Sequence, residues 1–426
     1  MTAASKGLPV AKSSSARLVV LLAFLLFINF VDRGNLATAA PLIKDELHLN
    51  STQLGLLLSA FFWSYTLCLF PVGWLAERFG AKPVITAGVV IWSLGTLLTG
   101  VAGGLYSLFA CRLLLGVGES TAFPCTSKLL ATELEVTQRG RANGVTVFGQ
   151  GLGPAFGTWA GGLIAAVAGW RPMFVIFGAL SLLWVLPWRR TQLSNASIPK
   201  NIPAVPLLPL KSILRQRAMW ATAVGHFGAN YGLYFVGSWL PTYLVKVKGL
   251  SVAHMATTAG SIYIVWALSA LAVGWAFDRL QSTSANRTTT SKTLLGIGCA
   301  GKISCMAGII FAPPTWAIPC LFVNEVFSGF ISVPLWTVSQ IIAGPRAIGR
   351  WMGVQMTVGN VAGVVAPVVT GIAVDLTGSF TAAFAAAGLF YVTSGIAWIF
   401  GIDKVEPLVW DDSSRERPGA PDYVAA

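Results

Sequence analysis

Four charged residues lie inside the long apolar runs of the first half of this sequence. Asp32 and Arg33 are adjacent in the first run, and Arg112 and Glu119 lie in the fourth. A charge within an apolar run that crosses a membrane is costly and usually has a function. Glu119 follows Arg112 by two helical turns, so both side chains lie on one helix face. Two acids and two guanidinium groups balance in charge, which limits the cost of burying them.

The chemistry open to these groups is anion binding and proton transfer. A guanidinium group matches a carboxylate with a planar fork of donors, so we expect Arg33 to receive a carboxylate. Burial favours the protonated form of a carboxyl group, whereas a nearby arginine favours the carboxylate. Asp32 and Glu119 are therefore expected to carry protons, and movement of Arg112 between them would switch which one does. A static ion network that only fixes helix packing is the alternative.

Polar residues also interrupt apolar runs in the second half of the chain. His226 and Asn230 are one helical turn apart, and they could bind substrate, take part in proton transfer or only hydrogen-bond between helices. Trp336, Gln340 and Asn360 are candidates for the lining of a binding cavity. The indole of Trp336 suits the C–H surface of a sugar, with simple packing as the alternative.

Lys302 and Glu325 are expected to form a buried pair. They lie at equal distances before and after the tight Pro313–Pro314 turn. In an antiparallel helical hairpin these positions have equal depth, and an uncompensated charge there would be costly. The pair is either a structural bridge or a second site of proton binding.

The composition indicates a membrane protein that positions these residues on helices. Of 426 residues, 55% are hydrophobic and 11% are charged, whereas about a quarter are charged in a soluble chain. Apolar runs long enough to span a bilayer recur along the chain. Spans are expected at 18–40, 53–76, 83–102, 105–128, 140–166, 170–190, 218–246, 252–278, 291–312, 315–344, 350–376 and 380–401. The fold class is therefore an all-α membrane protein with twelve transmembrane helices.

The distribution of basic residues predicts the orientation of these helices. The net charge is +13, and most Lys and Arg residues lie in short loops between the runs. With both termini inside, only Lys44, Arg171, Lys246 and Lys248 lie in outside connections. That asymmetry favours cytoplasmic termini. It also explains the positive charge without a nucleic-acid partner. The scattered cysteines show no CxxC spacing, so neither a metal site nor a disulfide framework is expected.

The chain divides into two similar halves. GWLAERFGAK (73–82) follows the second span, and GWAFDRL (274–280) follows the eighth. Such parallel repeats are typical of transporters. We expect a disordered N-terminus at 1–17, a six-helix bundle at 18–190, a cytoplasmic linker at 191–217, a second six-helix bundle at 218–401 and a cytoplasmic tail at 402–426.

At these residues the chain resembles the major facilitator superfamily. Gly73, Arg78, Gly80 and Lys82 fit the loop signature of that family, with Glu77 in place of the usual Asp. GQGLGPAFGTWAGG (149–162) resembles its fifth-helix signature. Gly153, Gly157 and Gly161 recur every four residues there, which gives a smooth face for close helix packing.

Three longer stretches resemble the anion:cation symporter branch of that superfamily. They are FVDRGNLATAAPLIKDEL (30–47), FFWSYTLCLFPVGW (61–74) and CRLLLGVGESTAFP (111–124). The resemblance implies a monomeric inner-membrane transporter that imports a sugar acid, such as an aldonate, hexuronate or aldarate, by proton symport and alternating access. It implies no cofactor other than the coupling proton, and a small organic anion and the lipid bilayer as partners.

The resemblance also implies roles for single residues. It gives Asp32, Arg33, Arg112 and Glu119 the roles proposed above, and it places Tyr65 and Gln150 against the substrate, with helix packing as their alternative. Four charged residues at the expected cytoplasmic helix ends are expected to form gating contacts when the carrier faces outward; they are Glu77, Arg78, Asp278 and Arg279. Solvated loop charges are the alternative for these four.

Other functions remain open at this point. Within transporters, the chain could move an aromatic or dicarboxylic acid, or exchange anions without protons. A membrane sensor that binds a ligand without moving it is a candidate from another class. An enzyme is not expected, because the sequence has no HExxH or GxSxG motif.

Overall fold

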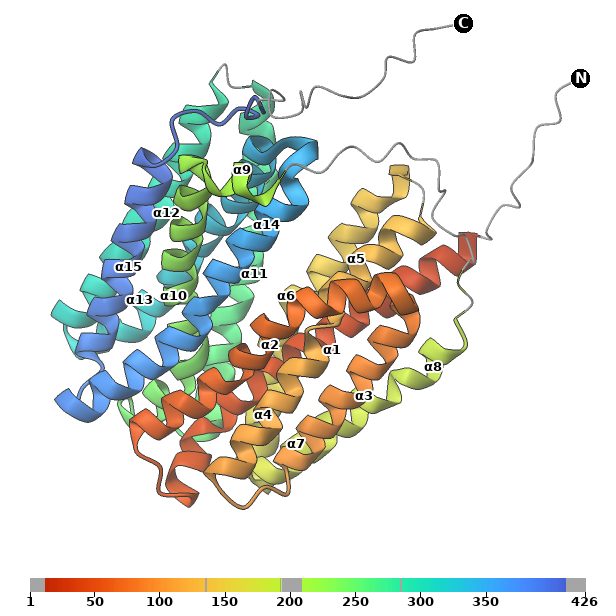
Figure 1. Cartoon of the computed structure of the whole chain (residues 1–426). Helices are drawn as coiled ribbons and strands as arrows, with labels where there is room; N and C mark the ends of the chain where they lie inside the picture. The colour runs from red at the N-terminus through yellow and green to blue at the C-terminus, as the bar shows by residue number, and fades with distance from the viewer. Residues whose placement is uncertain (1–11, 135, 192, 194–208, 284–285, 411–426) are drawn as a thin grey trace, which may run out of the picture.

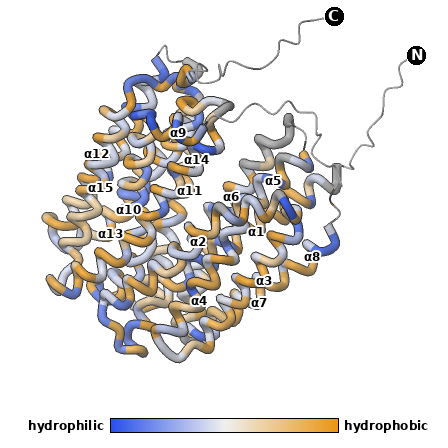
Figure 2. Tube along the Cα trace, viewed as in Figure 1, coloured by the Kyte–Doolittle hydropathy of each residue, from blue (hydrophilic) through white to orange (hydrophobic). Residues whose placement is uncertain are grey.

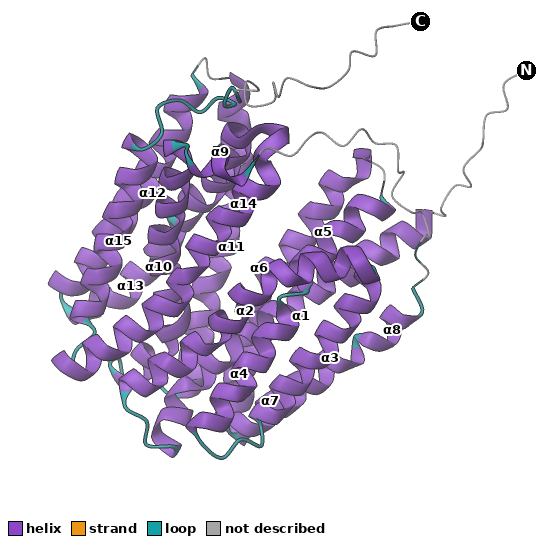
Figure 3. Ribbon diagram, viewed as in Figure 1, coloured by secondary structure: helices purple, strands orange, loops and turns teal. Residues whose placement is uncertain are grey.

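A computed structural model describes residues 12–134, 136–191, 193, 209–283 and 286–410. In these ranges the chain forms helices joined by short loops (Figure 3). This is the all-α architecture that the apolar runs predict. It positions the functional residues on a small number of long helices.

The first half contains eight of the described helices. They are α1 (Lys12–Glu46), α2 (Ser51–Phe79), α3 (Ala81–Thr99), α4 (Leu105–Glu119), α5 (Ala122–Glu133), α6 (Val136–Ala168), α7 (Trp170–Leu183) and α8 (Val185–Arg189). The fourth expected span is thus divided into α4 and α5 directly after Glu119. Pro124 explains the division, because it has no N–H to donate to the carbonyl one turn earlier.

The second half has the same succession of long helices. They are α9 (Leu210–Leu214), α10 (Arg217–Lys246), α11 (Val252–Thr283), α12 (Arg287–Phe311), the 3₁₀ turn η1 (Pro314–Trp316), α13 (Ala317–Val326), α14 (Ser328–Thr377) and α15 (Thr381–Phe400). The tenth expected span is divided after Val326. It then joins the eleventh within α14 through Gly344, whose φ of 64° bends the chain without a loop.

Eleven helical segments of the described chain are long and apolar enough to cross a membrane. The remaining long helix is α10, the seventh expected span, which carries more polar residues, among them His226 and Asn230. Hydrophobic residues extend along the helices and hydrophilic ones collect near the ends of the bundle (Figure 2). The protein is therefore a multi-pass membrane protein.

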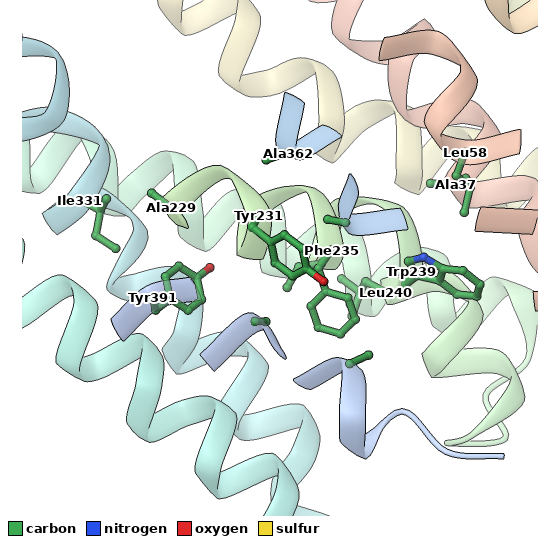
Figure 4. Packing of buried hydrophobic residues seen from close by; sticks show 14 of the residues in the cluster. Ala37, Leu58, Ala229, Tyr231, Phe235, Trp239, Leu240, Ile331, Ala362 and Tyr391 are labelled. Atoms are coloured by element: carbon green, nitrogen blue, oxygen red, sulfur yellow. The ribbon is translucent and has the colours of Figure 1, made fainter. Parts of the chain in front are cut away.

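The long helices form two groups that lie side by side (Figure 1). Both ends of the described chain lie at the same end of the molecule, which we call the termini end; the opposite end is the far end. Buried apolar residues of both groups form one cluster, which runs along the second group and includes the far end of the first. Figure 4 shows part of it, with Ala37 of α1 and Leu58 of α2 near Trp239 of α10.

Two helix crossings hold the groups together at the far end. In the α2–α14 crossing, a Cβ atom on Gly55 would overlap the carbonyl of Pro367, and one on Gly371 would overlap that of Ser51. In the α6–α11 crossing, a Cβ atom on Gly162 would overlap Ala256. Small residues thus let the backbones touch.

The same four helices are apart toward the termini end. No described atom lies within 4 Å of a Cβ atom built on Gly73 of α2, Gly144 of α6, Gly274 of α11 or Gly353 of α14. The two groups of helices therefore touch at the far end and diverge toward the termini end (Figure 1).

The glycine face of α6 packs mainly on α1. Cβ atoms on Gly149, Gly153 and Gly157 would meet Ala23, Phe27 and Val31 of α1, whereas one on Gly161 would meet Met173 and Phe177 of α7. This close contact confirms the packing role predicted from the glycine spacing. It fixes the position of α1, which carries Asp32 and Arg33.

The structure refines two segment boundaries. α1 begins at Lys12, inside the segment 1–17 that we expected to be disordered, because a helix started by the following apolar run can continue into polar residues. Part of the tail packs on the second group: Leu408 N donates to the carbonyl of Ile342 at 3.0 Å. Most of the linker 191–217 lies outside the described residues.

Candidate functional site

An ion pair between Arg33 of α1 and Glu119 of α4 forms the centre of the site. Arg33 Nε lies 3.2 Å from Glu119 Oε2. The Arg33 side chain is 16% exposed, whereas the Glu119 side chain is fully buried. Asn29 lies one turn before Arg33 and accepts a hydrogen bond from its Nη2 at 3.3 Å. Arg33 is thus the member of the pair that an incoming molecule can reach.

Aromatic rings surround the Arg33 guanidinium group. Its Cζ lies 4.5 Å from the ring centroid of Phe30 and 4.8 Å from those of Phe61 and Tyr65. Cation–π contacts at this distance stabilise a desolvated guanidinium. They also restrict its rotamers, so its donors are held in place. Tyr65 contacts Arg33 through the face of its ring.

Arg112 of α4 is buried behind Arg33. Its Nη2 donates to the backbone carbonyl of Arg33 at 3.4 Å. Its Nε, like Glu119 Oε1, has no hydrogen-bond partner among the described residues. Arg112 therefore contacts the backbone of α1. If Glu119 moved, Arg112 Nε and Glu119 Oε1 would be available for new hydrogen bonds.

Asp32, the residue before Arg33, is directed toward α7. Ser181 of α7 donates to its Oδ2 at 2.6 Å, and Asn35 donates to its Oδ1 at 3.3 Å. The carboxyl group is buried within the first group of helices. The structure thus brings all four charged residues into the core of that group, with Asp32 directed toward α7 and Glu119 directed toward Arg33.

The second group contributes a polar cluster opposite α2. Tyr234 of α10 donates from its hydroxyl to Asn360 Oδ1 at 2.7 Å. Its ring packs on Phe62 of α2, with centroids 4.4 Å apart. Asn230 donates to the carbonyl of Gly359 at 3.1 Å. Asn360 therefore lies where the two groups of helices meet, whereas Asn230 ties α10 to α14.

The other polar residues predicted from the sequence lie outside these contacts. His226 packs edge-on against Trp336, with ring centroids 5.1 Å apart. Gln340 is exposed one turn beyond Trp336 on α14, and Gln150 is half-buried on α6. No described contact links either glutamine to Arg33.

The four residues predicted to form a gate are described only in part. Arg78 is exposed, with Cζ 5.3 Å from the ring of Trp74, and Arg279 is exposed, with Cζ 5.7 Å from the ring of Trp275. The side chains of Glu77 and Asp278 lie outside the described residues.

Lys302 of α12 and Glu325 of α13 form a second buried ion pair. Lys302 Nζ lies 3.5 Å from Glu325 Oε1, and both side chains are 4% exposed. Asn324 donates to Glu325 Oε1 at 2.8 Å, and Ser328 donates to Oε2 at 2.6 Å. Both carboxylate oxygens are thus hydrogen-bonded, which favours a fixed pair.

Some residues of the site were missed by the sequence analysis. Tyr234 follows His226 and Asn230 at four-residue spacing, so its place on their helix face was available as a signal. Asn29 precedes Arg33 by one turn and could have been found in the same way. Ser181 gave no signal, because its contact with Asp32 depends on how α7 packs against α1.

Comparison with known proteins identifies the family. The model of the Major Facilitator Superfamily matches residues 22–367. A probable sulfoacetate transporter of Cupriavidus necator is 30% identical over 92% of this chain and 94% of its own length. A hexuronate transporter of Bacillus subtilis is 30% identical over 76% of this chain and 74% of its own length. A D-galactonate transporter of Escherichia coli is 28% identical over 79% of this chain and 84% of its own length.

Solved structures show the same fold. A bacterial homologue of the human lysosomal transporter Spinster, in an inward-facing and occupied conformation, has a TM-score of 0.77 at 19% identity, covering 92% of this chain and 97% of that one. Members of the matched family are transporters rather than enzymes. The chain therefore belongs to the major facilitator superfamily, and its relatives are those expected of the anion:cation symporter branch.

Proposed function

We propose that this protein imports an organic anion together with a proton. A sugar acid such as an aldonate, hexuronate or aldarate is the favoured substrate, since relatives are named for hexuronate and D-galactonate. The observation that carries the proposal is the Arg33–Glu119 pair, in which the guanidinium is partly exposed and the carboxylate is fully buried.

The pair couples anion binding to proton uptake by competition for one guanidinium group. A substrate carboxylate that reaches Arg33 displaces Glu119, because both bind the same donors. Glu119 is then a buried carboxylate without its cation, which is costly. Taking up a proton removes that charge. Anion and proton therefore bind together and are released together, and Asp32 serves as a second carrier on the α7 side.

Alternating access completes the cycle. The two groups of helices touch at the far end and diverge toward the termini end (Figure 1). With the termini in the cytoplasm, as the basic residues favour, this is an inward-facing state in the inner membrane. Rocking of one group against the other would expose Arg33 to the outside.

Uptake into proteoliposomes tests this coupling. We expect an inward proton gradient to drive accumulation of a labelled aldonate or hexuronate by the native protein. Glu119→Gln mimics the protonated acid, so it should keep exchange of labelled for unlabelled substrate but lose the response to the gradient. Lys404→Ala, in which an exposed lysine is removed, serves as the control. A gradient response that survives in Glu119→Gln contradicts the proposal.

A sulfoacetate-like anion is the second candidate substrate. The relative named for sulfoacetate matches nearly the full length of both chains. Sulfoacetate carries a sulfonate and a carboxylate, and either could bind the Arg33 fork. Competition of sulfoacetate with the labelled sugar acid in the same vesicles separates the two candidates. Substrate exchange by the native protein that does not respond to the proton gradient would instead indicate an anion exchanger.

A further inference from the structure

An aspartate of the second group of helices closes the N-terminus of α2 at the far end. Asp375 lies in the last turn of α14. Its Oδ1 accepts from the backbone N–H of Ser51 at 2.9 Å, and its Oδ2 accepts from the N–H of Thr52 at 2.7 Å and from the Thr52 hydroxyl at 2.6 Å. The first N–H groups of a helix have no partner within it, and a negative charge there is stabilising.

The sequence around α2 leaves these N–H groups for Asp375. Asn50 caps the helix through its own side chain, which accepts from Gln53 N at 2.7 Å. That bond satisfies one N–H and leaves those of Ser51 and Thr52. One turn before Asp375, Gly371 lies against the Ser51 backbone. The absence of a side chain at Gly371 lets α14 approach α2 closely enough for the Asp375 carboxylate to reach the N–H groups of Ser51 and Thr52.

Asp375 is itself exposed, and its contact differs from the other charged contacts at this end because it binds backbone N–H groups. Asp45 of α1 and Lys246 of α10 form an ion pair between the two groups, but the side chains are 62% and 35% exposed. An exposed pair between two side chains contributes little, because both side chains lose freedom when they are held in one geometry. Glu46 pairs with Arg171 within the first group. The α6–α11 crossing is formed by small and apolar side chains, among them Ala155 and Ala256.

We propose that Asp375 is a gating residue that holds the far end closed. Its three hydrogen bonds join α14 to α2 only while the far end is shut. They must break each time the two groups of helices separate there. This inference rests on the alternating access of the proposed function and adds a residue that sets the balance between the two states.

Distance measurements between spin labels test this role without any substrate. Tyr106 and Phe311 are highly exposed residues near the far end, one in each group of helices, and cysteines there can carry the labels. In Asp375→Ala we expect the ratio of long to short distances to rise about fivefold, the effect of losing a charge at a helix N-terminus near the surface. Asp375→Asn keeps one acceptor oxygen, so the distance ratio should rise less in this variant.

Asp45→Ala is the matched control, because it removes an aspartate that also joins the two groups at the same end. It should leave the distance ratio near that of the native protein. An unchanged ratio in Asp375→Ala, or an equal rise in Asp45→Ala, overturns the gating role. A lower melting temperature of Asp375→Ala with an unchanged ratio also overturns it and indicates a structural cap. A native protein that shows one distance under all conditions overturns alternating access itself.

Discussion

Glu119 and Glu325 occupy corresponding places in the two halves and have different surroundings. Each lies just before the break in its span, Glu119 at the end of α4 and Glu325 near the end of α13. Glu325 has hydrogen bonds at both oxygens and a lysine at 3.5 Å. Glu119 has one oxygen bound to Arg33 and the other unpartnered among the described residues.

The difference separates a fixed pair from a pair that can rearrange. A carboxylate with all acceptors satisfied gains little from moving. A carboxylate with a free oxygen, paired with a partly exposed cation, can give up that cation to another anion at lower cost. We infer that the first half carries the coupling and that the second half holds its helices in place. Three predictions test this division.

The largest effect is expected on stability, from removing one partner of the second pair. Lys302→Met leaves Glu325 buried without its cation, which costs about 3–5 kcal/mol. The double variant Lys302→Met with Glu325→Leu should recover most of this loss, because an apolar pair needs no compensation. Melting temperature and yield of folded protein measure both. A double variant no more stable than the single one contradicts a fixed structural pair.

The next effect concerns substrate binding at the first pair. Arg33→Lys keeps a positive charge beside Glu119 but loses the planar fork, so the affinity for a carboxylate substrate should fall about tenfold. Arg33→Ala should abolish binding. Thermal shift with a panel of sugar acids reads out both, since a ligand stabilises the folded state by mass action. Stabilisation that is undiminished in Arg33→Ala rules out Arg33 as the anion site.

The smallest effect is expected where the halves meet. Tyr234→Phe removes the hydroxyl that donates to Asn360 but keeps the ring on Phe62. The bond holds Asn360, a candidate substrate-binding residue, in position, so its loss should lower the affinity for substrate by up to about fivefold, the equivalent of one hydrogen bond of about 1 kcal/mol, with little change in melting temperature. Phe62→Leu is the matched control for the ring contact. A fall in melting temperature without a change in affinity would assign Tyr234 to packing alone.

The sequence allowed the spans and the candidate acids to be predicted, because apolar runs and charges within them are visible locally. Counting from the Pro313–Pro314 turn also led to Lys302 and Glu325. The sequence could not reveal that Arg33 binds Glu119 while Arg112 binds a backbone carbonyl, since that choice depends on side-chain geometry between helices.

Other features could not be predicted because they join distant segments. The bond between Asp375 and the start of α2 connects residues more than 300 positions apart, and neither segment carries a motif that names the other. The continuous α14 was also missed. A glycine followed by a proline, Gly344 and Pro345, usually indicates a loop, but here the chain bends at one residue and continues as a helix.

The glycine contacts at the far end have a consequence for the speed of the cycle. Because Gly55 and Gly371 meet the backbone of the partner helix, the two backbones can part at these points without interlocked side chains. We therefore expect unpacking at these glycines to add little to the barrier and the hydrogen bonds of Asp375 to add more. A single methyl group added at Gly55 would act as a wedge and leave the transporter facing outward.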